Sequence, residues 1–298
     1  MGITDHQAKF LAYELTRRLP PDDSERLSAT VAGAQVDLNP HQVDAALFAF
    51  ASPLAQGALL ADEVGLGKTI EAGLVIAQRW AERRRRILVI TPSNLRKQWH
   101  QELSEKFFLP CTILETRSYN EAMRAGRMQP LNAPEAIVIC SYQFARAKAS
   151  DVHAVPWDLV VIDEAHRLRN VYKPSNVTAN TLRMALAGRQ KLLLTATPLQ
   201  NSLMELFGLV TFIDERAFGD AKSFREQFAG GQERALASLR ERLRPICHRT
   251  LRRQVTAYVP YTRRLAMVQE FTPAESEDRL YDLVSEYLQR DNLQALPP

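Results

Sequence analysis

A glycine-rich loop followed by a lysine and a threonine is the first feature of the sequence that could do chemistry. Its residues are Asp62, Glu63, Val64, Gly65, Leu66, Gly67, Lys68, Thr69 and Ile70. Glycines allow successive backbone N–H groups to face one concavity, a following helix adds its positive end, Lys68 can reach outer phosphates, and the Thr69 hydroxyl can ligate Mg²⁺. Residues 62–70 are therefore predicted to bind phosphates, and we call them the phosphate loop.

Other interpretations of this loop are weaker. A glycine turn with a surface lysine is the plain structural alternative, but a strand-like run before the loop and a helix-like run from Ile70 to Trp80 argue against it. A dinucleotide fingerprint fails because Ile70 stands where the third glycine is needed. Asp62 occupies the place of the first glycine in the common pattern, which is a departure from it.

The second chemical feature is the acidic box, Asp163, Glu164, Ala165 and His166, which follows a predicted buried strand from Trp157 to Ile162. Asp163 could hold Mg²⁺, while Glu164 could polarise a water molecule for attack on a γ-phosphate. Alone, the carboxylate pair could be a solvated strand end, and His166 a structural histidine. With the phosphate loop, they predict a site for ATP and Mg²⁺ in which Lys68, Asp163 and Glu164 are catalytic and Thr69 and Asp163 hold the metal.

Both features follow strands of a predicted parallel sheet. Short apolar runs separated by helix-length segments occur at 58–61, 87–91, 136–140, 159–163 and 191–195. Runs such as ILVI and LVVI are apolar on both faces, as in strands covered by helices on both sides. Because ligands of such folds bind at the carboxyl ends of strands, we expect the phosphate loop and the acidic box side by side.

Helical segments surround this predicted α/β lobe. Two short helices are expected before residue 36, and a further helix begins at Pro40 with Asn39 as its N-cap. After Asp214 the sequence turns helical, with Phe218, Phe224, Phe228 and the stretch 239–253, and a capped amphipathic helix follows Thr272. The predicted domains are an N-terminal helical extension (1–36), an ATP-binding lobe (37–214), a helical protrusion with a connector (215–271) and the start of a second lobe (272–298).

Composition excludes several classes of protein. With 46% hydrophobic and 24% charged residues among 298, the chain resembles an ordinary α/β protein, and a net charge of +4 is too small to indicate a polyanion partner. The three cysteines are far apart, so neither a zinc site nor a disulfide framework is predicted. No signal peptide and no apolar run of membrane-spanning length is visible, so we expect a cytoplasmic protein without membrane contact.

The order of the motifs resembles a known family. GLGKT, DEAH and TAT resemble the first RecA-like lobe of superfamily two helicases. The longer strings LADEVGLGKTIEAG, ILVITPSNLRKQW, VICSYQFAR, WDLVVIDEAHRLRN and LLLTATPLQNSLMELFGL are similar to Swi/Snf-like double-stranded-DNA translocases, particularly the RapA-like branch that associates with RNA polymerase. The similarity covers about residues 38–214. It implies a RecA-like P-loop NTPase fold, and the family shares the departure at Asp62.

The resemblance also implies roles for further residues. Gln42 matches the glutamine that reads adenine, although three residues after Asn39 it could instead close a capping box. Thr195 and Thr197 match residues that couple nucleotide state to the motor, with His166 as their expected partner. Positions that face the DNA backbone in the family correspond to Thr91, Pro92, Ser93, Asn94, Ser141, Tyr142 and Asn201.

Two arginine groups have different interpretations. The run 83–86 is expected to be a solvated helix end, with contact to nucleic acid as the alternative. Arg249, Arg252 and Arg253 resemble the family's connector between lobes.

The resemblance implies a DNA-dependent ATPase that moves on duplex DNA and remodels or displaces bound proteins. RNA polymerase or another DNA-bound protein is the partner that it suggests. The alternatives are a strand-separating helicase, the motor of a restriction or phage-defence system, and a scaffold that binds nucleotide without hydrolysis. The sequence holds one RecA-like lobe and no arginine motif of a second, so we expect a longer protein, and weak ATP binding and little turnover by residues 1–298 alone.

Overall fold

The computed structural model describes residues 33–51, 56–228, 230, 232–259 and 267–288, together with residues 4, 9 and 30. The chain divides into two compact units, Met1–Val259 and Pro260–Pro298. None of the described helices is long and apolar enough to cross a lipid bilayer. The helices expected before residue 33 lie outside the described residues.

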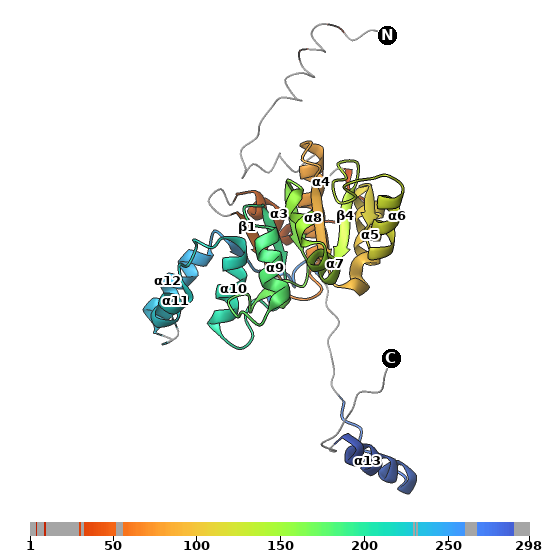
Figure 1. The fold of residues 1–298 in the computed structure, drawn as a ribbon. Helices are drawn as coiled ribbons and strands as arrows, with labels where there is room; N and C mark the ends of the chain where they lie inside the picture. Colours follow the sequence, from red (N-terminus) through yellow and green to blue (C-terminus); the bar gives the residue numbers. More distant parts are fainter. Residues whose placement is uncertain are drawn as a thin grey trace. The chain divides into compact units, whose positions relative to one another are not determined.

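The first unit is built on a seven-stranded sheet in the order β3-β4-β2-β5-β6-β1-β7, in which every pairing is parallel (Figure 1). Its strands are β1 (Gly57–Leu60), β2 (Ile87–Thr91), β3 (Cys111–Ile113), β4 (Ile137–Ser141), β5 (Leu159–Ile162), β6 (Lys191–Leu194) and β7 (Cys247–His248). The parallel sheet and the strands expected at the five apolar runs are confirmed. Their residues are buried on both faces, which explains why these runs do not alternate with polar residues.

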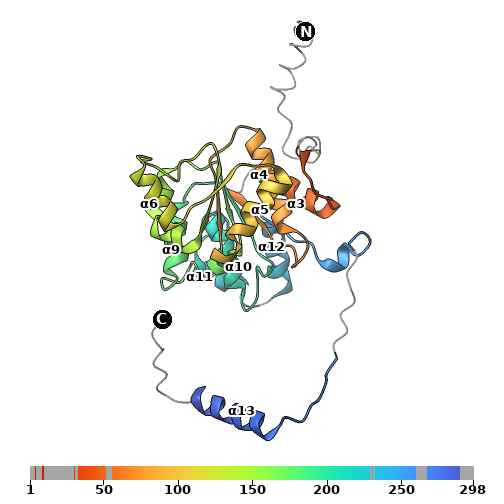
Figure 2. The same ribbon diagram turned by 90° about the vertical axis from the view of Figure 1, so that its right-hand side faces the viewer.

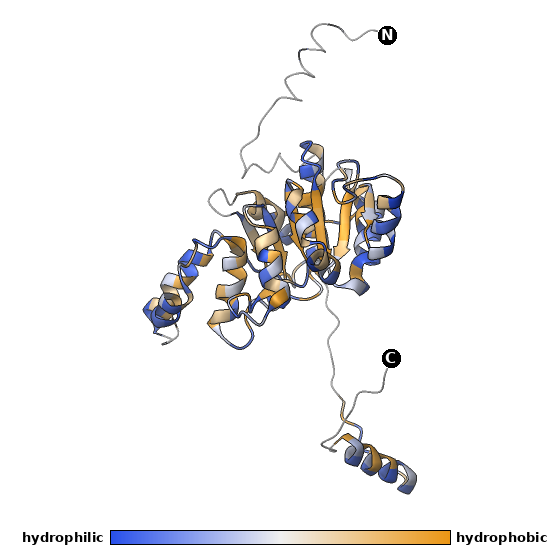
Figure 3. Cartoon of the chain, viewed as in Figure 1, coloured by the Kyte–Doolittle hydropathy of each residue, from blue (hydrophilic) through white to orange (hydrophobic). Residues whose placement is uncertain are grey.

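Helices cover both faces of the sheet. One face carries α3 (Pro40–Ala51), α4 (Lys68–Ala81) and α5 (Arg96–Phe107), which pack on residues such as Leu60, Val89 and Val161. The other face carries α6 (Thr116–Arg124), α7 (Tyr142–Ala147), α8 (Ala149–Ala154), α9 (Val177–Ala185) and α10 (Leu203–Ile213). Figure 2 shows the two helix layers on opposite sides, and Figure 3 shows that the strands between them are the most hydrophobic elements.

Two helices follow α10 in the segment where the sequence predicts a helical protrusion. They are α11 (Ala221–Phe228) and α12 (Glu233–Leu243). The contacting rings of Phe218, Phe224 and Phe228 join α11 to α10 through Phe207, and the Arg242 guanidinium of α12 lies over the Phe228 ring. In the second unit, the expected helix after Thr272 is observed as α13 (Glu275–Leu288). The chain also contains the short 3-10 turns η2 (Ser93–Leu95), η3 (Ala165–Leu168) and η4 (Arg252–Gln254).

Two strands were not predicted, and one helical prediction is wrong. The expected helix over 239–253 ends at Leu243, because Cys247 and His248 pair with Leu59 and Leu60 as the edge strand β7. Strand β3 was also missed, since it is only three residues long and partly buried. A strand of two or three residues leaves too little periodicity to detect. As a result, part of the segment expected to be a helical connector belongs to the sheet.

The direction of the strands sorts the candidate residues between two edges. The phosphate loop follows β1, the acidic box follows β5, and Thr195 and Thr197, which we call the threonine pair, follow β6. All three therefore lie at the carboxyl edge of the sheet. Arg83–Arg86 immediately precede β2 and therefore lie at the opposite edge. There Arg85 covers the Trp80 ring at 5.0 Å and the Arg86 Nε donates to Asn132. These contacts favour the interpretation of the run as a helix end.

Candidate nucleotide site

The phosphate loop has a backbone shape that needs its glycines. Gly65 and Gly67 adopt φ values of 84° and 90°, in the left-handed region where a Cβ is unfavourable. A Cβ on Gly67 would lie 2.4 Å from the Gln42 Nε2. Gly67 is also the residue from which α4 starts. The loop therefore turns from β1 into α4 in a conformation that other residues would disrupt.

The loop presents unused backbone donors at the start of α4. Within the described residues, no carbonyl accepts a hydrogen bond from the amides of Gly65, Gly67, Lys68 or Thr69. The next amides, of Ile70 and Glu71, both donate to the Gly67 carbonyl. Free amides at a helix N-terminus form a binding site for oxyanions, because the helix dipole adds positive potential there. This arrangement fits the phosphates of a nucleotide.

Lys68 lies folded against its own loop. Its Nζ donates to the carbonyl oxygens of Asp62, at 2.8 Å, and Glu63, at 3.2 Å. Burial lowers the pKa of Lys68, while the negative charges of Asp62, Glu164 and Asp163 act in the opposite direction. A phosphate oxygen can therefore replace the carbonyl oxygens as acceptors for the ammonium group. The ammonium group also interacts electrostatically with the carboxylates of the acidic box.

Asp163 is held in one orientation by three donors. Its Oδ2 accepts from the Trp99 Nε1 at 2.8 Å and from the Thr91 hydroxyl at 3.1 Å, and its Oδ1 accepts from the Glu164 amide at 2.8 Å. The Tyr142 hydroxyl also donates to the Asp163 carbonyl at 2.6 Å. Sequence reasoning placed Asp163 in the site but assigned none of its supports. Trp99 stands within a motif string, but the string does not show where its indole points.

Glu164 has a strained backbone. With φ 50° and ψ 46° it is one of three non-glycine residues at positive φ among the described residues. Such strain is typical of functional positions, where the surrounding structure compensates for its cost. The Glu164 Oε2 lies 3.0 Å from the His166 Nδ1. Both side chains are partly exposed at the carboxyl edge, so Glu164 can reach a water molecule there.

The threonine pair lies between the two motifs. Strand β6 separates β1 from β5, so the phosphate loop and the acidic box share an edge without being on neighbouring strands. The Thr195 amide donates to Leu60 of β1, and the Thr197 amide donates to the Thr195 Oγ1. The expected pairing of His166 with these threonines is not observed among the described residues, because His166 faces Glu164 instead. Thr195 and Thr197 nevertheless stand between the loop and the box.

Gln42 shows the capping alternative together with a loop contact. Its Oε1 accepts from the Asn39 amide at 3.1 Å, which closes the capping box, and its Nε2 donates to the Leu66 carbonyl at 3.0 Å. The Nε2 of His41 lies 2.9 Å from the same carbonyl. Gln42 therefore joins the start of α3 to the phosphate loop. Recognition of adenine by Gln42 stays a prediction, and it requires the amide to exchange one of these partners.

Two buried carboxyl groups stand at the two ends of the loop, on Asp62 and on Glu71 in the first turn of α4. Asp62 and Glu71 are both fully buried. Burial raises the pKa of Glu71 to about 9, and the charge of Asp62 acts in the same direction. For Asp62, burial acts to raise the pKa, but hydrogen bonds from His248 and Thr250 lower it overall. At neutral pH, Glu71 therefore carries a proton and Asp62 is ionised.

Several residues expected at a DNA surface are buried. Thr91 and Tyr142 are 0% and 3% exposed, and their hydroxyls face Asp163, so these side chains are not free to make the predicted DNA contacts in this arrangement. Pro92 is also buried, and Ser141 uses its side chain to cap α7. The hydroxyl groups at these strand ends donate hydrogen bonds to Asp163 or, in Ser141, cap a helix. Sequence alone could not separate this use from contact with phosphate.

The remaining DNA candidates, Ser93, Asn94 and Asn201, are exposed. Asn201 belongs to a loop held by the buried Glu205, which accepts hydrogen bonds from Gln200, Asn201 and Arg169. Burial acts to raise the pKa of Glu205, but these hydrogen bonds lower it overall. Glu205 thus fixes the shape of the loop that presents Asn201.

The oxygen donors at the edge fit Mg²⁺. The Thr69 hydroxyl and the Asp163 carboxylate are hard ligands, which Mg²⁺ combines with water and phosphate oxygens. Within the described residues, no three His, Cys, Asp or Glu side chains are grouped so as to hold a metal ion. Because Mg²⁺ usually keeps several waters and binds substrate phosphates, a cation held by Thr69 and Asp163 would take its other ligands from water and the nucleotide.

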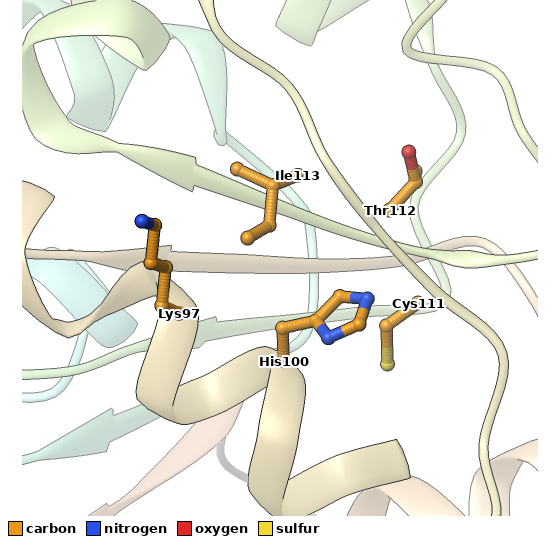
Figure 4. A pocket seen from close by; sticks show the side chains of 5 residues that line it. All are labelled: Lys97, His100, Cys111, Thr112 and Ile113. Atoms are coloured by element: carbon orange, nitrogen blue, oxygen red, sulfur yellow. The ribbon is translucent and has the colours of Figure 1, made fainter.

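Two surface hollows lie elsewhere. One, of about 280 Å³, lies between α5 and the edge strand β3, where His100 stands beside Cys111 (Figure 4). Burial raises the pKa of the Cys111 thiol to about 12, so it is not a nucleophile at neutral pH. The other, of about 540 Å³, is lined by residues including Tyr172, Arg183 and Phe207. Neither hollow is lined by the phosphate loop or the acidic box.

A parallel sheet between two helix layers, with a phosphate loop after β1 and an acidic box after β5, defines a RecA-like P-loop NTPase lobe. The family model of the SNF2-related domain matches residues 7–294 of the sequence, and the chain belongs to this family. It is an SNF2-family ATPase core lobe, as the motifs implied.

Relatives support this assignment. The chain is 32% identical over 282 residues to the "Uncharacterized ATP-dependent helicase YqhH" of Bacillus subtilis, covering 92% of this chain and 47% of that protein. It is 33% identical over 228 residues to the "RNA polymerase-associated protein RapA" of Serratia proteamaculans, covering 75% and 23%. The chain thus spans about half of the first relative and less than a quarter of the second.

Solved structures share the fold. The Sulfolobus solfataricus SWI2/SNF2 ATPase core in complex with dsDNA matches with a TM-score of 0.61 and 25% identity, over 74% of this chain and 45% of that one. A second structure, the Sulfolobus solfataricus SWI2/SNF2 ATPase core domain, matches with a TM-score of 0.59 and 25% identity, over 73% and 44%.

Proposed function

We propose that this chain is the ATP-binding lobe of a DNA-dependent ATPase that moves on duplex DNA and remodels protein–DNA complexes. The observation that carries the ATP site is the meeting, at one sheet edge, of free loop amides, Lys68 and an Asp163 carboxylate fixed by three donors. Preorganised donors and charges of this kind are what phosphoryl transfer requires, since its catalysis is largely electrostatic positioning.

The residues of the site divide the work. Loop amides and Lys68 would bind the phosphates, with Lys68 leaving the Asp62 and Glu63 carbonyls to do so. Thr69 and Asp163 would hold Mg²⁺, which supplies charge neutralisation on the phosphate oxygens. Glu164 would orient and deprotonate the attacking water, with His166 fixing its carboxylate. Thr195 and Thr197, between the loop and the box, would transmit the nucleotide state to the DNA-facing surface.

Duplex DNA is proposed as the track. One matched Sulfolobus solfataricus core was solved with dsDNA, and the exposed Ser93, Asn94 and Asn201 offer polar groups suited to sequence-independent backbone contacts. RNA polymerase is the first candidate for the remodelled protein, because the RapA relative is an RNA polymerase-associated protein. A second RecA-like lobe would complete the catalytic site.

ATP hydrolysis by the complete protein encoded by the gene tests this function. We expect duplex DNA to stimulate hydrolysis more than single-stranded DNA, without separation of strands. Glu164→Gln should abolish hydrolysis while keeping ATP binding. Full hydrolysis by this variant would contradict the role of Glu164. Strand separation would favour the helicase alternative, and the absence of any hydrolysis would favour a nucleotide-binding scaffold.

Residues 1–298 alone should bind ATP weakly and turn it over slowly, because transition-state charge is normally stabilised by arginines of a second lobe. Robust DNA-stimulated hydrolysis by this chain alone would contradict that expectation.

A further inference from the structure

The segment that follows the protrusion runs alongside the phosphate loop. The amides of Leu59, Ala61 and Glu63 donate in turn to the carbonyls of Ile246, His248 and Thr250, at 2.7, 2.7 and 3.2 Å. The regular spacing continues the pairing of β1 with β7 beyond the ends of both strands. Because residues 62 and 63 begin the phosphate loop, the loop and the segment 248–252 share one hydrogen-bond ladder.

Hydrogen bonds that involve side chains join the same two segments. The Thr250 amide donates to the Asp62 Oδ1 at 2.7 Å, and the Arg252 amide donates to the Glu63 Oε2 at 2.7 Å. The Arg252 guanidinium reaches the loop itself, where Nε and Nη2 donate to the Val64 carbonyl at 2.9 and 2.5 Å. A Cβ on Gly65 would lie 3.3 Å from the same Nη2. Arg252 thus spans the outer side of the loop.

We propose that Arg252 is a positioning residue that clamps the phosphate loop in its nucleotide-accepting shape. The loop carbonyls of Asp62 and Glu63 are bound by Lys68, which must release them to bind phosphate. The Arg252 contact to Val64 does not depend on Lys68, so it can preserve the loop when the lysine leaves. The chain continues from this clamp through Val259 to the second compact unit. A displacement of this connecting segment would therefore be transmitted to the phosphate loop through Arg252.

The proposal rests on the proposed ATP site. Two measurements distinguish a failure of the Arg252 clamp from a failure of the ATP site. The first is hydrogen–deuterium exchange of peptides covering 59–67 and 246–253 in the nucleotide-free chain. Arg252→Ala should speed exchange of these hydrogen-bonded amides roughly tenfold, because the guanidinium no longer holds the Val64 carbonyl next to the ladder. The exchange rate of Arg252→Lys should fall between those of the unaltered chain and Arg252→Ala, since lysine is a point charge and lacks the planar fork of arginine. Unchanged exchange in Arg252→Ala would overturn the clamp.

The second measurement is the affinity for a fluorescent ATP analogue with Mg²⁺. Arg252→Ala should weaken binding roughly three- to tenfold, with the melting temperature unchanged, since Arg252 is exposed. Arg253→Ala is the matched control, because its side chain is also exposed and has no hydrogen bond or ion pair in the described part of the chain. Faster exchange with unchanged affinity would overturn the positioning role. If the unaltered chain binds no nucleotide, the proposed function fails, and exchange alone decides the clamp.

Discussion

At the scale of single residues, the site depends on side chains that hold the Asp163 carboxylate in place. Asp163 owes its orientation to Trp99 and Thr91, which come from α5 and the end of β2. Their residue types do not reveal this use, because a tryptophan on a helix normally indicates core packing and a threonine at a strand end is uninformative. The motifs predicted Lys68, Asp163 and Glu164, whereas the supports depend on which strands become neighbours.

Replacement of Trp99 tests this support. Trp99→Phe removes the Nε1 donor to Asp163 and keeps most of the ring. We expect the complete protein to hydrolyse ATP roughly 3- to 30-fold more slowly and to need more Mg²⁺ for half-maximal rate. Trp157→Phe is the matched control, because its Nε1 donates to the Val152 carbonyl away from the site. Equal rates for the two variants would contradict the positioning of Asp163 by Trp99.

The protonated Glu71 predicts a pH dependence of stability. Its folded pKa, about 9, is above its ordinary value of 4.5, so the folded chain binds more protons than the unfolded chain between these values. The stabilisation is complete below pH 4.5 and is lost as the pH rises through 9. Between pH 6 and 8, the free energy of unfolding of the unaltered chain should fall relative to Glu71→Gln by about 1.4 kcal/mol per pH unit.

Urea unfolding at pH 6 and pH 8 measures this difference. The glutamine variant keeps a neutral side chain at every pH and so lacks the slope that Glu71 contributes. The control is Glu121→Gln, which makes the same change on an exposed side chain of α6. If Glu71→Gln and Glu121→Gln showed the same pH dependence, Glu71 would not be protonated in the folded chain.

At the scale of elements, strands of four or five buried residues were predictable and shorter ones were not. Runs such as Ile87–Thr91 are apolar throughout because helices cover both faces. By contrast, β7 is formed by Cys247 and His248, whose pairing with β1 brings segments together across most of the lobe. No local pattern encodes such a pairing, so the contact of Thr250 and Arg252 with the phosphate loop was also not predictable.

Close packing of α10 gives an element-scale prediction. A Cβ on Gly208 would lie 1.9 Å from the Arg169 carbonyl oxygen, which is backbone and cannot turn aside. Gly208→Ala should therefore lower the free energy of unfolding by roughly 3 kcal/mol, because α10 must move away from η3. Gly33→Ala is the control, since no atom of the described residues lies within 4 Å of the added Cβ. Equal stabilities of the two variants would contradict this packing.

At the scale of the whole molecule, one sheet edge brings together motifs that are spread over residues 62–197. The short apolar runs predicted the parallel sheet, and the motifs that follow these runs predicted the family. The insertion of β6 between β1 and β5 was not predicted, since strand order depends on long-range pairing. Thr195 and Thr197 consequently stand between the two halves of the site.

Titration of this chain with a fluorescent ATP analogue tests the central claim, that the phosphate loop and acidic box form a nucleotide site. We expect saturable binding that needs Mg²⁺. Lys68→Ala should weaken it by roughly tenfold or more, through loss of a charged contact to phosphate. Lys97→Ala, on the surface of α5, should bind like the unaltered chain. Equal binding by Lys68→Ala and the unaltered chain would contradict the site.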